Sequence, residues 1–157
     1  MKLYIQQKIF TWGDKFSVYD GNGEEKYTVE GEILSFGKKL HLYDRQGNEL
    51  VFIEQQLLTF LPKYLIYRGE HVIAEVVKEF TFFHTEYSVN GPGWLVQGDF
   101  WDHEYSVLDG DTVITSVSKE WFTLGDAYEI SISAGADEIA ALAVVLVIDA
   151  CIEAQRD

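Results

Sequence analysis

The chain has 157 residues, of which 47% are hydrophobic and 15% aromatic, enough apolar material for one domain with a buried core. Its net charge of −14 is uneven: residues 1–78 carry 10 basic and 11 acidic side chains (−1), and residues 79–157 carry 2 and 15 (−13). So acidic a surface repels phosphate backbones, which argues against nucleic-acid binding.

The first residues, MKLYIQQKIF, do not have the pattern of a secretion signal, because polar side chains interrupt the apolar stretch after Ile5. The single cysteine, Cys151, cannot form an internal disulfide, which fits a reducing compartment. We therefore expect a cytoplasmic protein.

A repeat of 24 residues is the clearest pattern in the first half of the chain. Residues 9–31, IFTWGDKFSVYDGNGEEKYTVEG, align without a gap on residues 33–55, ILSFGKKLHLYDRQGNELVFIEQ. The same shift carries Phe36, Lys39 and Tyr43 onto Phe60, Lys63 and Tyr67. Weaker copies follow at 80–91, 99–111 and 122–132.

Each unit of the repeat is predicted to be a β-hairpin. In KFSVYD (15–20), Phe16 and Val18 alternate with polar neighbours, which is the period of a strand with one buried face. DGNG (20–23), DRQGN (44–48) and DGD (109–111) are typical hairpin turns, because Gly and Asn readily adopt positive φ. Six such units predict roughly twelve antiparallel strands in a sandwich or barrel.

The last segment, DEIAALAVVLVIDACIEAQ (137–155), is predicted to be a buried helix. Its central fourteen residues, 139–152, contain one charge, Asp149. They would span roughly 21 Å as a helix, too little for a hydrocarbon core of about 30 Å, so no transmembrane span is expected. The valines would also suit a strand, but length and alanines favour a helix, with Asp137 and Glu138 at its N-terminus.

A helix that is apolar on all sides is buried on all sides, and in an all-β protein it fits inside a closed barrel. We therefore predict an all-β-dominated (α+β) fold, in which about 12 antiparallel strands form a closed β-barrel around a central hydrophobic C-terminal helix. Asp149 must then be hydrated or hydrogen-bonded, because an unpaired buried carboxylate is costly. The side chains expected in the helix core are Ile139, Leu142, Val145, Leu146, Ile148 and Ile152.

With these elements in place, the chain resembles the LURP-one-related family, whose fold is similar to the tubby C-terminal domain and the phospholipid scramblases. The resemblance rests on residues 7–67, above all ILSFGKKLHLYDRQGNEL (33–50) and IEQQLLTFLPKY (53–64), and on the closing helix. It implies one tubby-like domain over residues 1–157 and no defined activity. Tubby-like domains are associated with phosphoinositides, but no basic motif can be matched here residue by residue, and the net charge opposes that ligand.

Lysines offer one candidate site. The repeat superimposes Lys15, Lys39 and Lys63, with Lys38 beside one of them. Because equivalent positions of successive hairpins lie at the same barrel end, these lysines could form a patch for an anion or a lipid headgroup. The alternative is that they only make outward positions soluble at strand starts.

The acidic half offers other candidates. His84, Glu86, Asp99, Asp102, His103 and Glu104 are residue types that zinc and iron sites use, although the repeat itself also explains where the two histidines stand. Five aromatic side chains there would suit either packing or docking to a partner or a membrane interface: Trp94, Phe100, Trp101, Trp121 and Phe122. Cys151 is expected to be a small buried side chain rather than a nucleophile.

No catalytic signature is present, and no cofactor is expected. The favoured hypothesis is a non-catalytic binding or scaffold module that recognises a lipid headgroup, an amphiphile or a protein at the barrel rim, including peripherally at a membrane. The alternatives are a metal- or carboxylate-dependent enzyme that uses the acidic half and a purely structural or oligomerising protein.

Overall fold

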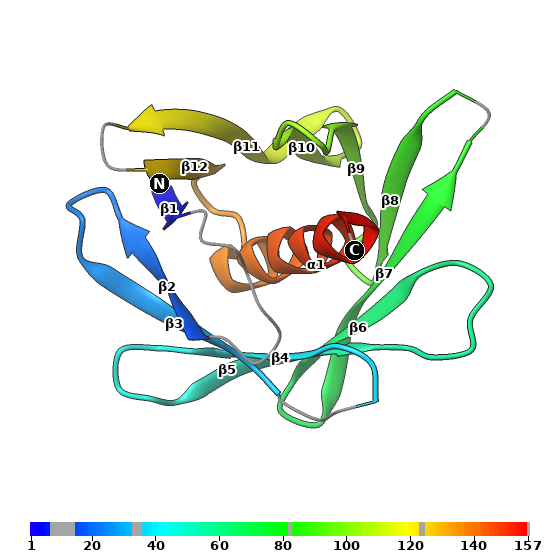
Figure 1. Ribbon diagram of the computed structural model, residues 1–157, viewed down its shortest axis with the longest axis horizontal. Coiled ribbons are helices and arrows are strands. Elements are labelled where there is room, and N and C mark those ends of the chain that lie inside the picture. Colours follow the sequence, from blue (N-terminus) through cyan, green and yellow to red (C-terminus); the bar gives the residue numbers. More distant parts are fainter. Residues whose placement is uncertain (7–14, 33–35, 82, 123–124, 157) are drawn as a thin grey trace.

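The computed structural model describes residues 1–6, 15–32, 36–81, 83–122 and 125–156. It confirms the predicted fold: twelve antiparallel strands close into a barrel in the order β1-β12-β11-β10-β9-β8-β7-β6-β5-β4-β3-β2, and helix α1 lies in its middle (Figure 1). The elements are β1 (Lys2–Gln6), β2 (Lys15–Asp20), β3 (Glu25–Gly31), β4 (Lys39–Tyr43), β5 (Glu49–Gln55), β6 (Lys63–Arg68), β7 (His71–Phe80), β8 (Thr85–Asn90), β9 (Trp94–Asp99), β10 (Glu104–Asp109), β11 (Thr112–Phe122), β12 (Gly125–Ile132) and α1 (Glu138–Arg156).

The barrel has two different ends, because connections between successive antiparallel strands alternate from one end to the other. The tight turns after β2, β4, β6, β8 and β10 lie at one end, together with the link from β12 to α1. We call this the turn end. The connections after β1, β3, β5, β7, β9 and β11 lie at the other end, which we call the loop end.

The sequence repeat is reproduced in the backbone of hairpins β2–β3 and β4–β5. In each turn an aspartate, Asp20 or Asp44, accepts hydrogen bonds from the backbone N–H groups two and four residues later, at 2.9–3.0 Å. Gly23 and Gly47 supply the positive φ of these turns, 79° and 84°. The strand register shifts at the tyrosine before each of three turns, Tyr19, Tyr43 and Tyr67.

The core lies between the inward side chains of the strands and every side of α1. Burial alternates along the strands: in β4, Leu40 and Leu42 are buried, whereas their neighbours are partly exposed. Of the six helix residues expected in the core, Ile139 is partly buried and the other five expose 3% or less. In the part of the chain that the structure describes, no helix is long and apolar enough to cross a membrane.

Candidate functional site: the loop end of the barrel

The loop end carries most of the large apolar side chains that are exposed among the described residues. Ten large apolar side chains are exposed among the described residues. Seven of them lie at the loop end, and the other three, Met1, Val72 and Val113, lie at the turn end. Single exposed apolar groups are ordinary, whereas a group of them at one end is a candidate interaction surface. We call the seven the apolar rim: Phe36 (88% exposed), Leu57 (51%), Leu58 (106%), Phe60 (101%), Phe80 (61%), Phe83 (93%) and Trp101 (55%).

The β5–β6 loop is the most exposed part of the apolar rim. Leu58 at its tip has a φ of 60°, a left-handed conformation that costs an L-residue roughly 1–2 kcal/mol. The loop is anchored at its base, where Leu57 packs against Gly37 and the Gln55 side chain accepts a hydrogen bond from the Lys38 backbone N–H at 3.0 Å. Neither the strained backbone nor the exposed apolar side chain stabilises the folded protein in water, so Leu58 is a candidate for a role in binding.

Lys15, Lys39 and Lys63 each begin a strand at the loop end, just behind the apolar rim. The residues that follow Lys39 and Lys63 are buried and the residue that follows Lys15 is partly buried, so the three lysines lie on the outer wall. Lys39 lies 3.9 Å from Glu54, and Lys63 lies 3.9 Å from Glu75. These ion pairs are long and partly exposed, and such pairs contribute little to stability.

The fourth candidate lysine, Lys38, turns inward instead. Its ammonium group donates a hydrogen bond to the Ala150 carbonyl at 2.7 Å, near the C-terminal end of α1, where a positive charge complements the helix dipole. Lys78 is also buried, with its Nζ 5.3 Å from the centre of the Phe80 ring, and burial lowers the pKa of this amine. Both lysines are therefore components of the barrel interior.

Beneath the apolar rim, aromatic side chains contact the acidic group of the buried helix. The Tyr128 hydroxyl donates a hydrogen bond to Asp149, and the His103 ring stacks on Tyr128 at 4.9 Å, with its Nδ1 3.7 Å from the Asp149 carboxylate. Burial, and then the Asp149 charge, raise the pKa of Tyr128. The carboxylate of Asp149 is thus hydrogen-bonded, as its place in an apolar helix requires.

Cys151 lies in the same region and is buried. Burial raises the pKa of the Tyr64 and Tyr87 hydroxyls, and the neighbouring Cys151 thiol raises it further. Burial raises the pKa of the Cys151 thiol to about 11, so the thiol is protonated near neutral pH. This environment is that of a packed side chain and not of a reactive nucleophile.

The candidate metal ligands do not converge. His84 lies 3.7 Å from Glu86, whereas His103 faces Asp149, so the two histidines have different carboxylate neighbours. Asp99, Asp102 and Glu104 are exposed. Within the described residues, no group of three or more His, Cys, Asp or Glu side chains could hold a metal ion.

The five candidate aromatic side chains of the acidic half have different places. Trp94 and Phe100 are buried, and Trp101 belongs to the apolar rim. The side chains of Trp121 and Phe122 lie outside what the structure describes. Of the three candidates whose side chains the structure describes, Trp101 alone is exposed, and it joins Phe80 and Phe83 of the same half in the apolar rim.

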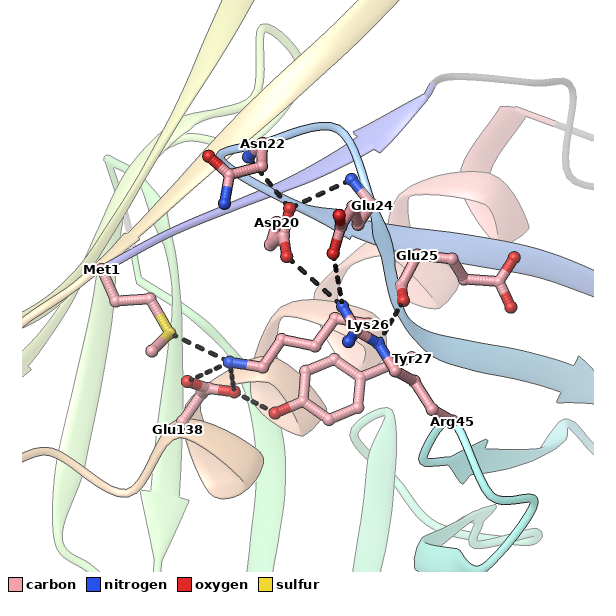
Figure 2. A network of polar contacts seen from close by, with 9 residues as sticks. All are labelled: Met1, Asp20, Asn22, Glu24, Glu25, Lys26, Tyr27, Arg45 and Glu138. Carbon is pink, nitrogen blue, oxygen red and sulfur yellow. Dashed lines mark hydrogen bonds and ion pairs between the residues drawn. The ribbon is translucent and has the colours of Figure 1, made fainter.

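The turn end has a different character, because charged side chains connect its hairpins to the helix (Figure 2). The Lys26 ammonium lies 3.1–3.2 Å from both carboxylate oxygens of Glu138, which also accepts a hydrogen bond from the Tyr27 hydroxyl. Arg45 reaches from the β4–β5 turn to Asp20 on the neighbouring hairpin, at 3.4 Å. The contacts of Glu138 with Lys26 and Tyr27 hold the N-terminus of α1 in the barrel, whereas Arg45 joins the two hairpins to each other. The acidic side chain in the first turn of α1 also complements the helix dipole.

A family model described as LURP-one-related matches residues 1–149. The chain belongs to the LURP-one-related family. It is 36% identical over 149 residues to the uncharacterized protein YxjI of Bacillus subtilis (strain 168), covering 95% of this chain and 92% of YxjI. Its fold is similar to the X-ray structure of an Arabidopsis thaliana protein, with a TM-score of 0.68 and 14% identity over 96% of this chain and 90% of that one. The family prediction is confirmed. These comparisons support the fold and name no activity.

The 24-residue repeat of this chain contains a signal for the apolar rim. Phe36 stands three residues before Lys39, and Phe60 stands three residues before Lys63. The first unit has the same pair, Trp12 and Lys15, although Trp12 lies outside the described residues. An aromatic side chain followed by a lysine at the next strand start is thus part of the repeat.

Proposed function

We propose that this protein is a non-catalytic docking module that attaches to a lipid–water interface through the apolar rim. The observation that carries the proposal is the exposure of seven large apolar side chains on successive loops of one barrel end. Side chains that project separately suit a fluid medium that can fill the space between them. Aromatic and leucine side chains are the types that partition into membrane interfaces.

The lysines behind the apolar rim favour a lipid over a neutral apolar partner. A lysine near a membrane surface contributes about 1 kcal/mol of attraction to anionic lipid. The weak ion pairs of Lys39 and Lys63 leave their ammonium groups able to turn toward phosphates. The acidic second half repels the same surface, so the charges would orient the protein with its β2–β6 side against the lipid.

The apolar rim has enough side chains for reversible binding. Full burial of one leucine or phenylalanine side chain is worth roughly 1.5–3 kcal/mol. Insertion of Leu58 and Phe60 alone would therefore provide roughly 3–6 kcal/mol, in the range of weak peripheral association. The other rim residues and the lysines would add to this value.

The proposal is tested by sedimentation of the full-length protein with vesicles of phosphatidylcholine, with and without phosphatidylglycerol. We expect wild type to bind both and to bind the anionic vesicles more tightly. The double variant Leu58→Ser/Phe60→Ser should weaken binding to both by at least roughly tenfold, because it removes two inserting groups. The matched control is Val72→Ser/Val113→Ser, which removes two exposed apolar groups from the turn end and should bind like wild type.

The lysine contribution has its own test. The triple variant Lys15→Gln/Lys39→Gln/Lys63→Gln should abolish the preference for anionic vesicles and leave binding to neutral vesicles intact. Failure of wild type to bind any vesicle would overturn the proposal. If the rim variant instead abolished self-association in a light-scattering measurement, the apolar rim would be an interface between protein copies.

A further inference from the structure

A separate cavity lies at the turn end, away from the apolar rim. It has a volume of about 360 Å³ and opens between hairpin β6–β7, the β8–β9 turn and the first turns of α1. This size lies within the range of small-molecule sites. Its floor is apolar and buried, since the floor residues expose 9% or less: Ile66, Ala74, Trp94, Ala140 and Val144.

The shape of the cavity follows the helix. Ala140 and Val144 are one turn apart on α1, so the apolar floor extends along the helix for roughly 6 Å. Ala74 on β7 and Ala140 on α1 contribute only small methyl groups to the lining of the cavity. A slim apolar group such as an alkyl chain fits a space of this form.

The mouth of the cavity is charged. Arg68 and Asp137 line it, with side chains 47% and 46% exposed. Nη2 of Arg68 lies 3.2–3.3 Å from the two carboxylate oxygens of Asp137, and Asp137 also accepts a hydrogen bond from the Ala140 backbone N–H at 3.1 Å. Nε and Nη1 of Arg68 make no hydrogen bond to any described residue, so the guanidinium retains donors for a second anion.

We infer that this cavity binds a single-chain amphiphile with a carboxylate head. The alkyl chain lies along the floor of the cavity, and the carboxylate accepts hydrogen bonds from the remaining donors of Arg68. A planar guanidinium suits a carboxylate in geometry and charge, and it can bridge two carboxylates at once. The helix N-terminus beside Asp137 adds positive potential at the same mouth. This site is independent of the membrane contact proposed for the apolar rim.

The test is a titration of the full-length protein with decanoate below its micelle concentration, followed by the fluorescence of Trp94. Decanol and decyltrimethylammonium serve as neutral and cationic probes with the same chain. We expect saturable binding in the order decanoate, decanol, decyltrimethylammonium. Arg68→Gln should weaken decanoate binding at least tenfold and leave decanol binding unchanged. The control Arg45→Gln alters the neighbouring turn outside the cavity and should change neither affinity.

A second pair of variants tests the location. Ala140→Leu fills the floor, and Ile73→Phe narrows the cavity from a partly buried position where the fold should tolerate it. Either variant, once circular dichroism shows that it is folded, should abolish decanoate binding. The fluorescence response should disappear in Trp94→Phe and persist in Phe60→Ser. Absence of saturable binding, tighter binding of the cationic probe, or a response that survives Trp94→Phe would overturn the inference.

Discussion

Replacement of Leu146 by alanine tests whether α1 is the centre of the core. Leu146 exposes 1% of its surface and lies midway along a helix that strands surround on all sides. Because a closed barrel cannot collapse easily around the lost side chain, we expect a cost well inside the known range for buried leucines, about 3–4 kcal/mol. For a chain of this length each kcal/mol lowers Tm by roughly 2–4 °C, so Leu146→Ala should lower it by roughly 10 °C.

The matched control is the same substitution at Leu58, which is fully exposed in the apolar rim. Leu58→Ala should change the free energy of unfolding by no more than about 0.5 kcal/mol. Urea denaturation followed by circular dichroism measures both variants against wild type. The reasoning would be refuted if the two substitutions cost the same, or if Leu146→Ala cost less than about 1 kcal/mol, because α1 would then not be packed as described.

Two further predictions concern titratable groups. Burial of His41 lowers its pKa, but hydrogen bonds to Glu49 and Glu32 outweigh this effect and raise the pKa above 6.5. The contribution of His41 to the free energy of unfolding is therefore complete below pH 6.5 and is lost as pH rises through the raised pKa. His41→Gln should flatten this fall when the free energy of unfolding is measured by urea denaturation at several pH values. An unchanged dependence on pH would contradict the pairing. Burial raises the pKa of the Cys151 thiol to about 11. A disulfide reagent at neutral pH should therefore label Cys151 only at the rate at which the protein unfolds. Rapid labelling of the native protein would contradict this expectation, because it would show that the thiol is accessible.

The fold could be predicted because several local signals agreed. The turns at Asp20 and Asp44 follow from residues that favour positive φ, and their equivalence appears directly in the repeat. The helix followed from a segment too apolar for a surface and too short for a membrane. The closed form of the barrel then followed from burial, since a helix that is apolar on all sides must be surrounded by strands on all sides. The number of strands and their order are consistent with each of these steps.

The candidate site could be predicted only in part, because the alternation of buried and exposed side chains along a strand does not continue into the loops. Trp94 and Trp101 stand in similar surroundings in the sequence, yet Trp94 begins β9 facing inward and Trp101 lies in the following loop facing water. Leu57 and Leu58 are adjacent and both are exposed, so the alternation of buried and exposed residues does not hold there. Lys38 and Lys39 are adjacent as well, and only the three-dimensional arrangement shows that Lys38 turns to the helix while Lys39 remains outside.

The filled interior of the barrel is the reason why both of our proposed sites lie at its ends. Because α1 fills the barrel, a ligand must bind near a mouth or on the wall. At the turn end, charged and backbone hydrogen bonds connect the hairpins tightly, and the remaining space is a small cavity beside the helix N-terminus. At the loop end, Leu58 is both strained and fully exposed, and the neighbouring loops present further apolar groups. Strain and exposed apolar surface are both unfavourable in water, and this is the physical basis for our proposal that the loop end docks to a lipid–water interface.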